Sequence, residues 1–226
     1  MAHSYRKNQC IVKKYPNFSA GFPLLASRLK PCLLYTSMAV EIECTVDYAR
    51  TQSAGTLEVG GAVDYEELDL RGRKLGRKGT ARTSAENVLG AFRKRFGWDY
   101  RLYDVRFNIP GGLPMDGPSA GIALAVALMS AISGKAPIPY LALTGEITVQ
   151  GEVRPVGGVR EKLEAAIAAG ADTILIPQAN WEDTYEKLPA HIIPVEDIAQ
   201  VMRAAFDIPH EAAIEDGVLP FLCTTA

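Results

Sequence analysis

The segment Met115–Gly121 carries the side chain best suited to nucleophilic chemistry, that of Ser119. It follows an expected strand and a glycine-rich loop, and Pro118 favours the first turn of a helix, so Ser119 is expected within that turn. Free backbone N–H groups and the positive end of the helix dipole lie there, and both stabilise an alkoxide or an oxyanion. The small residues around the serine let a peptide backbone approach closely. Considered by spacing alone, an ordinary capped helix start is the commoner explanation.

A second segment, Gly157–Leu163, supplies a candidate general base in Lys162. Leu163, Ala166 and Ile167 form an apolar face at helical spacing, and Lys162 stands at the edge of that face. Partial burial and a nearby helix N-terminus both lower the pKa of a lysine, which accepts a proton from serine only in its neutral form. Both effects favour this chemistry. Most lysines are solvated surface residues, and that is the alternative for Lys162 taken alone.

Alternating strand and helix patterns surround these two segments. Apolar–polar alternation and β-branched runs predict strands at 40–46, 55–60, 100–109, 141–147, 149–156, 173–176 and around 192–193. Apolar periodicity and capping residues predict helices from Thr83 or Ser84 to Gly97, at 118–133, at 158–169, after Asn180 and at 195–206. The charged stretch 64–78 is expected to be a solvated loop. Because strands and helices interleave from Val40 onward, the expected fold class is α+β, with mixed α/β layers.

The composition is that of one folded domain. The chain has 226 residues, of which 48% are hydrophobic and 22% charged, and a domain of this size needs no disulfide or metal to fold. The net charge of -2 gives no indication of a nucleic-acid or membrane partner. The cysteines and histidines show no metal-ligand spacing, so no metal site is expected, and the cysteine usage suits a cytoplasmic protein. The apolar run 120–132 is too short to span a bilayer, and no secretory signal is evident.

Composition also divides the chain into three parts. Residues 1–37 lack helix or strand periodicity, and Cys32–Ser37 resembles the translation of a transposase end used in sequencing libraries. We expect residues 1–37 to be a non-homologous leader, either an assembly artefact or a natural flexible segment. One domain is expected at 38–208, followed by a C-terminal tail at 209–226.

Four motifs, in order along the chain, resemble the Lon protease family. The serine motif is Asp116–Gly121 and the lysine motif is Pro155–Lys162. Between them, Leu143–Ile147 and Gly151–Pro155 are also similar to Lon sequences. The interval between the serine and the lysine agrees with the spacing in the family, and the resemblance covers residues 84–206.

The resemblance implies the fold of the Lon proteolytic domain, which is similar to domain 2 of ribosomal protein S5, and a serine endopeptidase of the Lon type. Ser119 and Lys162 then form a catalytic dyad without histidine. Ser119 attacks the scissile carbonyl after Lys162 takes its proton, and Lys162 acts again as the base when water hydrolyses the acyl-enzyme.

Further residues match supporting positions of the family. Thr144 matches a threonine whose hydroxyl helps to hold the lysine. The loop residues Gly117 and Pro118 precede the serine, and the backbone N–H groups of this turn supply the oxyanion hole. Asp116 matches an acid that shapes the loop, with a plain loop or N-cap residue as the equal alternative. Glu146 and Arg160 also match, and subunit packing explains them as well as chemistry does.

The resemblance and the strand before the serine motif together suggest how substrate binds. The strand ends at Phe107, Asn108, Ile109 and Pro110, and its exposed edge is expected to pair with an extended substrate by strand addition, which tolerates many sequences. The family implies unfolded or damaged protein substrates and a hexameric ring that hides the proteolytic sites in a chamber. No nucleic acid and no membrane segment is expected.

Full Lon proteases carry an ATPase module ahead of this domain. No GxxxxGK[ST] phosphate loop is present here, because Gly72–Lys78 lacks the lysine and the hydroxyl residue at the required places. The chain is therefore interpreted either as a piece of an ATP-dependent Lon or as a stand-alone Lon-like protease, and residues 97–181 favour the LonB-like or stand-alone subgroup. No cofactor is expected in this chain; ATP and Mg²⁺ enter only if the intact protein has an ATPase module.

The competing function class is a non-proteolytic, ring-forming module of the same fold in a bacterial DNA-repair ATPase family. Those modules lack the Asp-Gly-Pro-Ser-Ala-Gly motif, which this sequence keeps together with Lys162. The near-neutral charge also disfavours phosphate contacts with DNA. A third possibility is an inactive fragment whose ring does not close.

Overall fold

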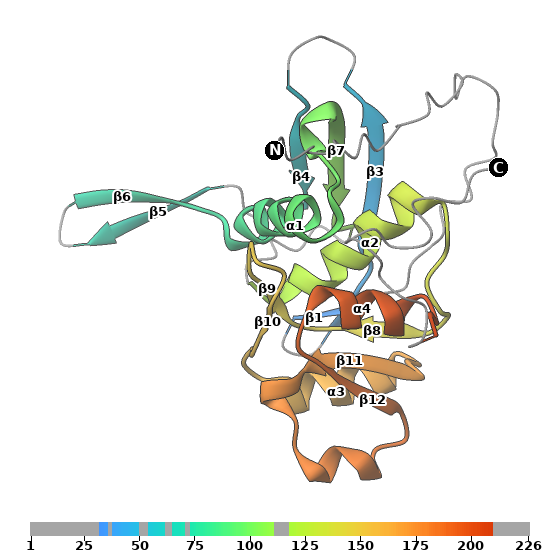
Figure 1. The fold of residues 1–226 in the computed structure, drawn as a ribbon. Coiled ribbons are helices and arrows are strands. Elements are labelled where there is room, and N and C mark those ends of the chain that lie inside the picture. The colour runs from blue at the N-terminus through green and yellow to red at the C-terminus, as the bar shows by residue number, and fades with distance from the viewer. Residues whose placement is uncertain are drawn as a thin grey trace, which may run out of the picture.

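The computed structural model describes residues 32–35, 38–49, 54–61, 65–70, 73–110 and 118–209. For the strands at 32–35, 65–70 and 73–78 it describes the backbone alone. In this part of the chain, a five-stranded and a three-stranded sheet pack with four α-helices in layers (Figure 1). The expected α+β class is confirmed.

The five-stranded sheet has the order β12-β11-β8-β1-β2. Its strands are β1 Cys32–Tyr35, β2 Met38–Val40, β8 Leu141–Leu143, β11 Thr173–Pro177 and β12 His191–Val195. β11 is parallel to β8 and β12, β8 is parallel to β1, and only the edge strand β2 is antiparallel to its neighbour. Parallel strands are normally covered on both faces, and this sheet follows that rule.

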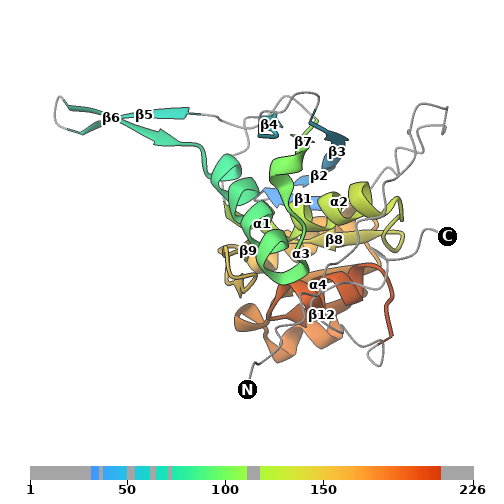
Figure 2. The ribbon, with the colours of Figure 1, turned by 45° about the horizontal axis from the view of Figure 1, so that its top comes forward.

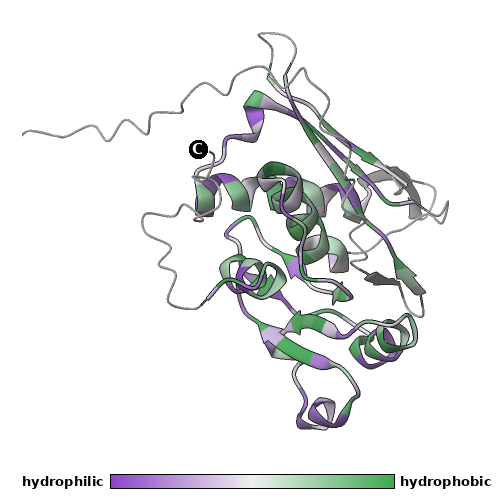
Figure 3. Cartoon of the chain, turned by 90° about the vertical axis from the view of Figure 1, so that its right-hand side faces the viewer, coloured by the Kyte–Doolittle hydropathy of each residue, from purple (hydrophilic) through white to green (hydrophobic). Residues whose placement is uncertain are grey.

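Four helices surround the sheets, as Figures 1 and 2 show: α1 Thr80–Phe96, α2 Gly121–Ser133, α3 Val159–Ala168 and α4 Ile198–Ala205. On one face of the five-stranded sheet, Leu143 and Leu175 pack in a cluster that includes residues of α2 and α4. On the other face, Ala142 and Ile174 pack with Leu163 of α3 in a second cluster. Apolar residues therefore gather between helices and sheets. Figure 3 colours the same elements by the hydropathy of their residues.

Helix α2 is the centre of the core. Every residue from Gly121 to Ser130 is buried, because the helix has the three-stranded sheet and α1 on its sides and α4 beyond. It ends at Gly134, which adopts the left-handed conformation typical of a helix C-terminus. No helix in the described ranges is both long and apolar enough to cross a membrane.

The three-stranded sheet has β7 in its centre. Its strands are β3 Glu43–Tyr48, β4 Leu57–Gly60 and β7 Tyr103–Asn108. β7 is antiparallel to β3 and parallel to β4, and every residue of β7 from Val105 to Asn108 has a partner on both sides. Val105 and Phe107 point into the core, where α1 and α2 cover this face.

The remaining elements are short. They are the strand pairs β5 Tyr65–Leu70 with β6 Arg73–Lys78 and β9 Glu146–Ile147 with β10 Val153–Arg154, and the 3₁₀ turns η1 Tyr100–Leu102, η2 Pro118–Ala120, η3 Gln178–Asn180 and η4 Asp183–Lys187.

The charged stretch expected to be a solvated loop is instead a β-hairpin that extends away from the body of the domain (Figure 1). The register places Glu66 opposite Arg77 and Asp69 opposite Lys74. The backbone of the two strands pairs over six positions, from Tyr65 with Lys78 to Leu70 with Arg73.

Two further elements differ from the sequence expectations. Cys32–Tyr35, inside the expected leader, forms β1 and pairs with β8 and β2, so these four residues are part of the sheet. The rest of the leader and the tail from 210 onward lie outside the described residues, and the domain boundaries stay a prediction. Helix α1 begins at Thr80, ahead of the expected start, and Ser84 is a buried residue within it rather than a cap.

Candidate active site

Ser119 lies in the turn η2, directly before the first residue of α2. This is the place expected from the proline and the small residues. The backbone of the turn is bonded to the segment that follows β8. The Gly145 N–H donates to the Ser119 carbonyl at 3.0 Å, and the Ile122 N–H donates to the Gly145 carbonyl at 3.1 Å. Ser119 itself is half-buried.

Gly121 lets the serine turn approach that segment closely. A Cβ atom at Gly121 would lie 2.5 Å from the backbone nitrogen of Ile147 and 3.1 Å from the carbonyl oxygen of Gly145. Real side chains do not tolerate such a contact with backbone atoms. Gly121, two residues after Ser119, is therefore required by the packing of the helix start on β9.

The other side of the turn rests on α1. Ser84 is almost completely buried, and its Oγ donates to the carbonyl oxygen of Pro118 at 3.4 Å. Pro118 is thus tied to one helix, and the Ser119 carbonyl is tied to the segment between β8 and β9.

Lys162 lies in the first turn of α3, where its backbone N–H donates to the Gly158 carbonyl at 3.1 Å. The side chain is only 6% exposed, so the solvated surface lysine allowed by the sequence is excluded. Its Nζ donates to Oγ1 of Thr144 at 3.3 Å, and no ion pair found among the described residues includes it. Burial lowers the pKa of Lys162, because removal from water disfavours the ammonium form.

Thr144 connects the lysine with the serine turn. It is fully buried, and its N–H donates to the Leu175 carbonyl at 3.1 Å. Its hydroxyl oxygen accepts the hydrogen bond from Lys162 Nζ. The N–H of the next residue, Gly145, donates to the Ser119 carbonyl, and the Gly145 carbonyl accepts from the Ile122 N–H. Two adjacent residues that follow β8 therefore contact the two motifs: Thr144 contacts the lysine, and Gly145 contacts the turn that holds the serine. These two motifs are far apart along the chain.

Comparison with known proteins gives a family match. A model of the Lon protease (S16) C-terminal proteolytic domain matches residues 67–207. This chain belongs to the Lon protease family. Lon protease 2 of Bacillus subtilis (strain 168) is 39% identical over 165 residues, which are 72% of this chain and 29% of that protein.

Two other Lon proteases match over shorter stretches. Lon protease of Methanosarcina barkeri is 46% identical over 118 residues, 49% of this chain and 15% of that protein. Lon protease of Helicobacter pylori (strain 26695) is 43% identical over 111 residues, 46% of this chain and 13% of that protein. The chain thus spans less than a third of the length of these relatives. It is a Lon-type serine peptidase domain, and the DNA-repair module is not favoured.

The remaining predicted site residues of this Lon domain lie before Ser119, in β9 and in α3. Asp116 and Gly117 lie outside the described residues, and Pro118 is exposed at the start of η2. Glu146 opens β9. Arg160 is on the solvent side of α3, where its Nε lies 3.4 Å from the Glu164 carboxylate.

The expected substrate edge at Phe107–Pro110 is wrong. β7 is the central strand of its sheet, so both of its edges are already paired over Val105–Asn108, and the Ile109 N–H donates to the Gly60 carbonyl at 3.0 Å. Over Val105–Asn108 this strand therefore has no free edge that could pair with an added strand. Phe107 and Ile109 are also fully buried. The sequence showed that this strand leads to the serine, but not which strands lie beside it.

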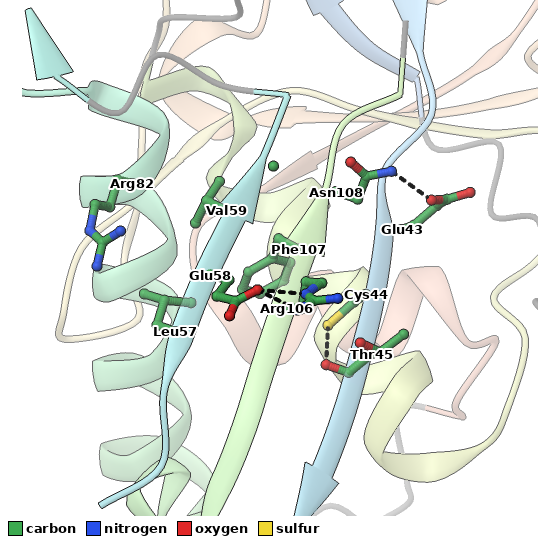
Figure 4. Close-up of a pocket in the computed structure, with 11 residues that line it drawn as sticks. Glu43, Cys44, Thr45, Leu57, Glu58, Val59, Arg82, Arg106, Phe107 and Asn108 are labelled. Carbon is green, nitrogen blue, oxygen red and sulfur yellow. Dashed lines mark hydrogen bonds and ion pairs between the residues drawn. The ribbon is translucent and has the colours of Figure 1, made fainter. Parts of the chain in front are cut away.

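A groove of about 620 Å³ runs over the three-stranded sheet toward α1 (Figure 4). Asn108 and Phe107 line it together with Arg82 of α1. Neither Ser119 nor Lys162 belongs to its lining. The described residues also contain no cluster of three or more His, Cys, Asp and Glu side chains that could hold a metal ion.

The sequence reasoning missed the contacts that place the two segments. Leu175 acts through its backbone carbonyl, which no side-chain pattern reveals. Asn180 was expected to cap a helix, but its side chain bonds to the backbone of Val156. The match of Leu143–Ile147 to the family was the only signal that pointed to Thr144 and Gly145.

Proposed function

We propose that this Lon domain hydrolyses peptide bonds in unfolded or damaged proteins with Ser119 as the nucleophile and Lys162 as the general base. The observation that carries the proposal is the buried Lys162, whose Nζ donates a hydrogen bond to Thr144. The residue after Thr144, Gly145, donates to the Ser119 carbonyl. A buried lysine without a carboxylate partner in the described structure is unusual unless its neutral form is used.

In the proposed reaction, the neutral amine of Lys162 accepts the proton of the Ser119 hydroxyl while Oγ attacks the scissile carbonyl carbon. The ammonium then gives this proton to the leaving amine, and the C–N bond breaks to leave an acyl-enzyme. Water attacks the ester carbonyl, Lys162 takes a proton from the water, and the serine leaves with that proton. The enzyme returns to its starting form with one peptide bond hydrolysed.

Two features of the site support this use of Lys162. Burial lowers the pKa of the amine, so more of it is neutral at a given pH. The hydrogen bond to Thr144 uses one N–H group of the amine and leaves its lone pair for the serine proton. The start of α2 supplies the positive end of a helix dipole near Ser119. In this proposal the backbone N–H groups of Gly117 and Ser119 form the oxyanion hole. Asp116 and Pro118 shape the loop that holds them.

The proposal extends to the activity of the intact protein. Family membership supports protein quality control by proteolysis in the cytoplasm, in a ring of six copies that encloses the sites. ATP and Mg²⁺ take part only through an ATPase module of the intact protein. The residues of this chain supply the peptidase chemistry.

Cleavage of casein by the 226-residue chain, with and without ATP, tests the dyad. The unsubstituted chain is expected to cleave casein, and the Ser119→Ala and Lys162→Ala variants are expected to be inactive. Retained cleavage in either variant overturns the assignment. A chain that leaves casein intact but binds DNA with strong salt dependence would favour the non-proteolytic ring module.

A further inference from the structure

We propose that Asn180 is a positioning residue for Lys162, because its side-chain amide fixes the backbone of Val156 just ahead of helix α3. The inference rests on the proposed role of Lys162 as the base. Asn180 ends the turn η3, which follows directly after β11.

The contact between Asn180 and Val156 uses both ends of the amide. The Val156 N–H donates to Oδ1 of Asn180 at 2.8 Å, and Nδ2 of Asn180 donates to the Val156 carbonyl at 3.0 Å. The pair is part-buried. An amide side chain supplies a donor and an acceptor side by side, so it can satisfy both backbone groups of one residue, as a neighbouring strand would.

The anchor matters because it fixes the backbone that enters α3, in addition to the packing of Val159 and Leu163 in the second core cluster. Only Gly157 and Gly158 separate Val156 from the first residue of the helix. Gly158 adopts a left-handed conformation with φ 64°, and no side chain caps the helix. The Lys162 N–H bonds to the Gly158 carbonyl. Glycine is the least restricted residue, so a displaced Val156 would let this first turn, and Lys162 with it, shift.

Strand β11 also holds the partner of the lysine. The carbonyl of Leu175, in the middle of β11, accepts the N–H of Thr144 at 3.1 Å. Strand β11 thus fixes Thr144 directly, the turn after it fixes the entry to α3 through Asn180, and the hydrogen bond from Lys162 Nζ to Thr144 Oγ1 links the two. Figure 1 shows β11 beside α3 at the lower end of the domain. Loss of the Asn180 anchor should therefore disturb the position of the amine more than the binding of substrate.

Kinetics of peptide cleavage by the full chain test this inference with Asn180→Ala and Asn180→Asp. The alanine variant removes both bonds, and a misplacement of the base on the scale of 1 Å lowers kcat by about 100-fold. KM should stay unchanged, and the acid limb of the kcat profile should move to higher pH because a loosened Lys162 gains water. The aspartate keeps an acceptor for the Val156 N–H but sets its second oxygen against the Val156 carbonyl, so it should also lower kcat with KM unchanged.

Asp104→Ala is the matched control. Asp104 also bonds twice to a single residue, through Oδ1 to the N and Oγ1 of Thr56 at 2.9 Å and 2.8 Å, but in the other sheet. It should change thermal stability without moving the pH profile. If Asn180→Ala keeps the kcat and pH profile of this control while Lys162→Ala is inactive, the positioning role is wrong and the dyad stands. If Lys162→Ala remains active, the proposed function itself fails. Thermal melting by circular dichroism identifies a variant that does not fold, and Asn180→Asp then provides the comparison.

Discussion

The Nζ of Lys162 donates a hydrogen bond to Oγ1 of Thr144 at 3.3 Å, inside a part of the domain where both side chains are buried. Transfer of an ammonium out of water costs several kcal/mol unless it is paired or becomes neutral. A hydroxyl group is a weak partner for a full charge. The site therefore favours the neutral amine, which is the form that a general base requires.

Replacement of Ser119 by alanine should lower peptide cleavage by about 10⁴-fold or more, since covalent catalysis is lost. The side chain is small and half-buried, so the melting temperature should barely change. Ser133→Ala is the control, because Ser133 lies at the other end of the same helix, where its hydroxyl donates to the Met129 carbonyl and accepts from the Lys135 N–H. Equal activity in both variants would remove Ser119 from the mechanism.

Lys162→Met should separate activity from stability. Methionine fills a similar volume without a charge, so the cost of burying an amine disappears and stability should stay equal or rise. Cleavage should be abolished, because no base remains. Lys187→Met, at an exposed lysine of η4, should leave both quantities unchanged. Denaturant unfolding and casein cleavage give the two readouts, and the Ser119→Ala/Lys162→Met double variant should be no less active than either single one.

The pH dependence of stability has a definite sign. Burial lowers the pKa of Lys162 in the folded state, whereas an unfolded lysine has a pKa of about 10.4. Between these two values the unfolded chain binds more protons, so the contribution of Lys162 to stability rises with pH in this window. Below the folded-state pKa, the full penalty of the buried ammonium is present.

Activity should follow the same titration. The rate of cleavage should rise as pH increases through the lowered pKa of Lys162, because the neutral amine is the reactive form. The unfolding free energy of Lys162→Met, measured against pH, should lose the rise described above. A parallel pH dependence in the original chain and in Lys162→Met would assign the effect to another group.

Thr144→Val should weaken catalysis without removing it. Valine keeps the shape of the buried threonine but leaves the amine without its hydroxyl partner, which costs about 1–3 kcal/mol of stability. A lost hydrogen bond worth about 1.4 kcal/mol corresponds to a tenfold lower rate. Thr144→Ser should restore most of the activity, because it returns the hydroxyl, and failure of this rescue would assign the effect to packing alone.

Gly121→Ala should destabilise the domain by about 1–3 kcal/mol and reduce cleavage, since the added Cβ lies 2.5 Å from the Ile147 nitrogen and pushes the serine turn away. Gly157→Ala serves as the comparison. A Cβ there meets nothing within 4 Å, and Gly157 does not have a positive φ, so stability should hardly change. Equal melting temperatures for the two variants would contradict the close approach.

The sequence by itself determined the local features of this protein. It placed Ser119 in a turn at the start of a helix and Lys162 beside an apolar helical face, and the structure confirms both positions. It also predicted the α+β class and the family, because periodicity, capping residues and the order of motifs are properties of the linear sequence. Their catalytic roles stay predictions.

Only the tertiary structure decided which segments are neighbours. It placed β7 in the centre of its sheet, paired strands 65–70 and 73–78, and placed the Leu175 carbonyl against Thr144 and the Asn180 amide against Val156. The decisive contacts pass through backbone carbonyls and amides, and every residue type presents these groups. Local pattern therefore positions the reactive side chains on their own elements, whereas strand order and packing determine what each of them meets.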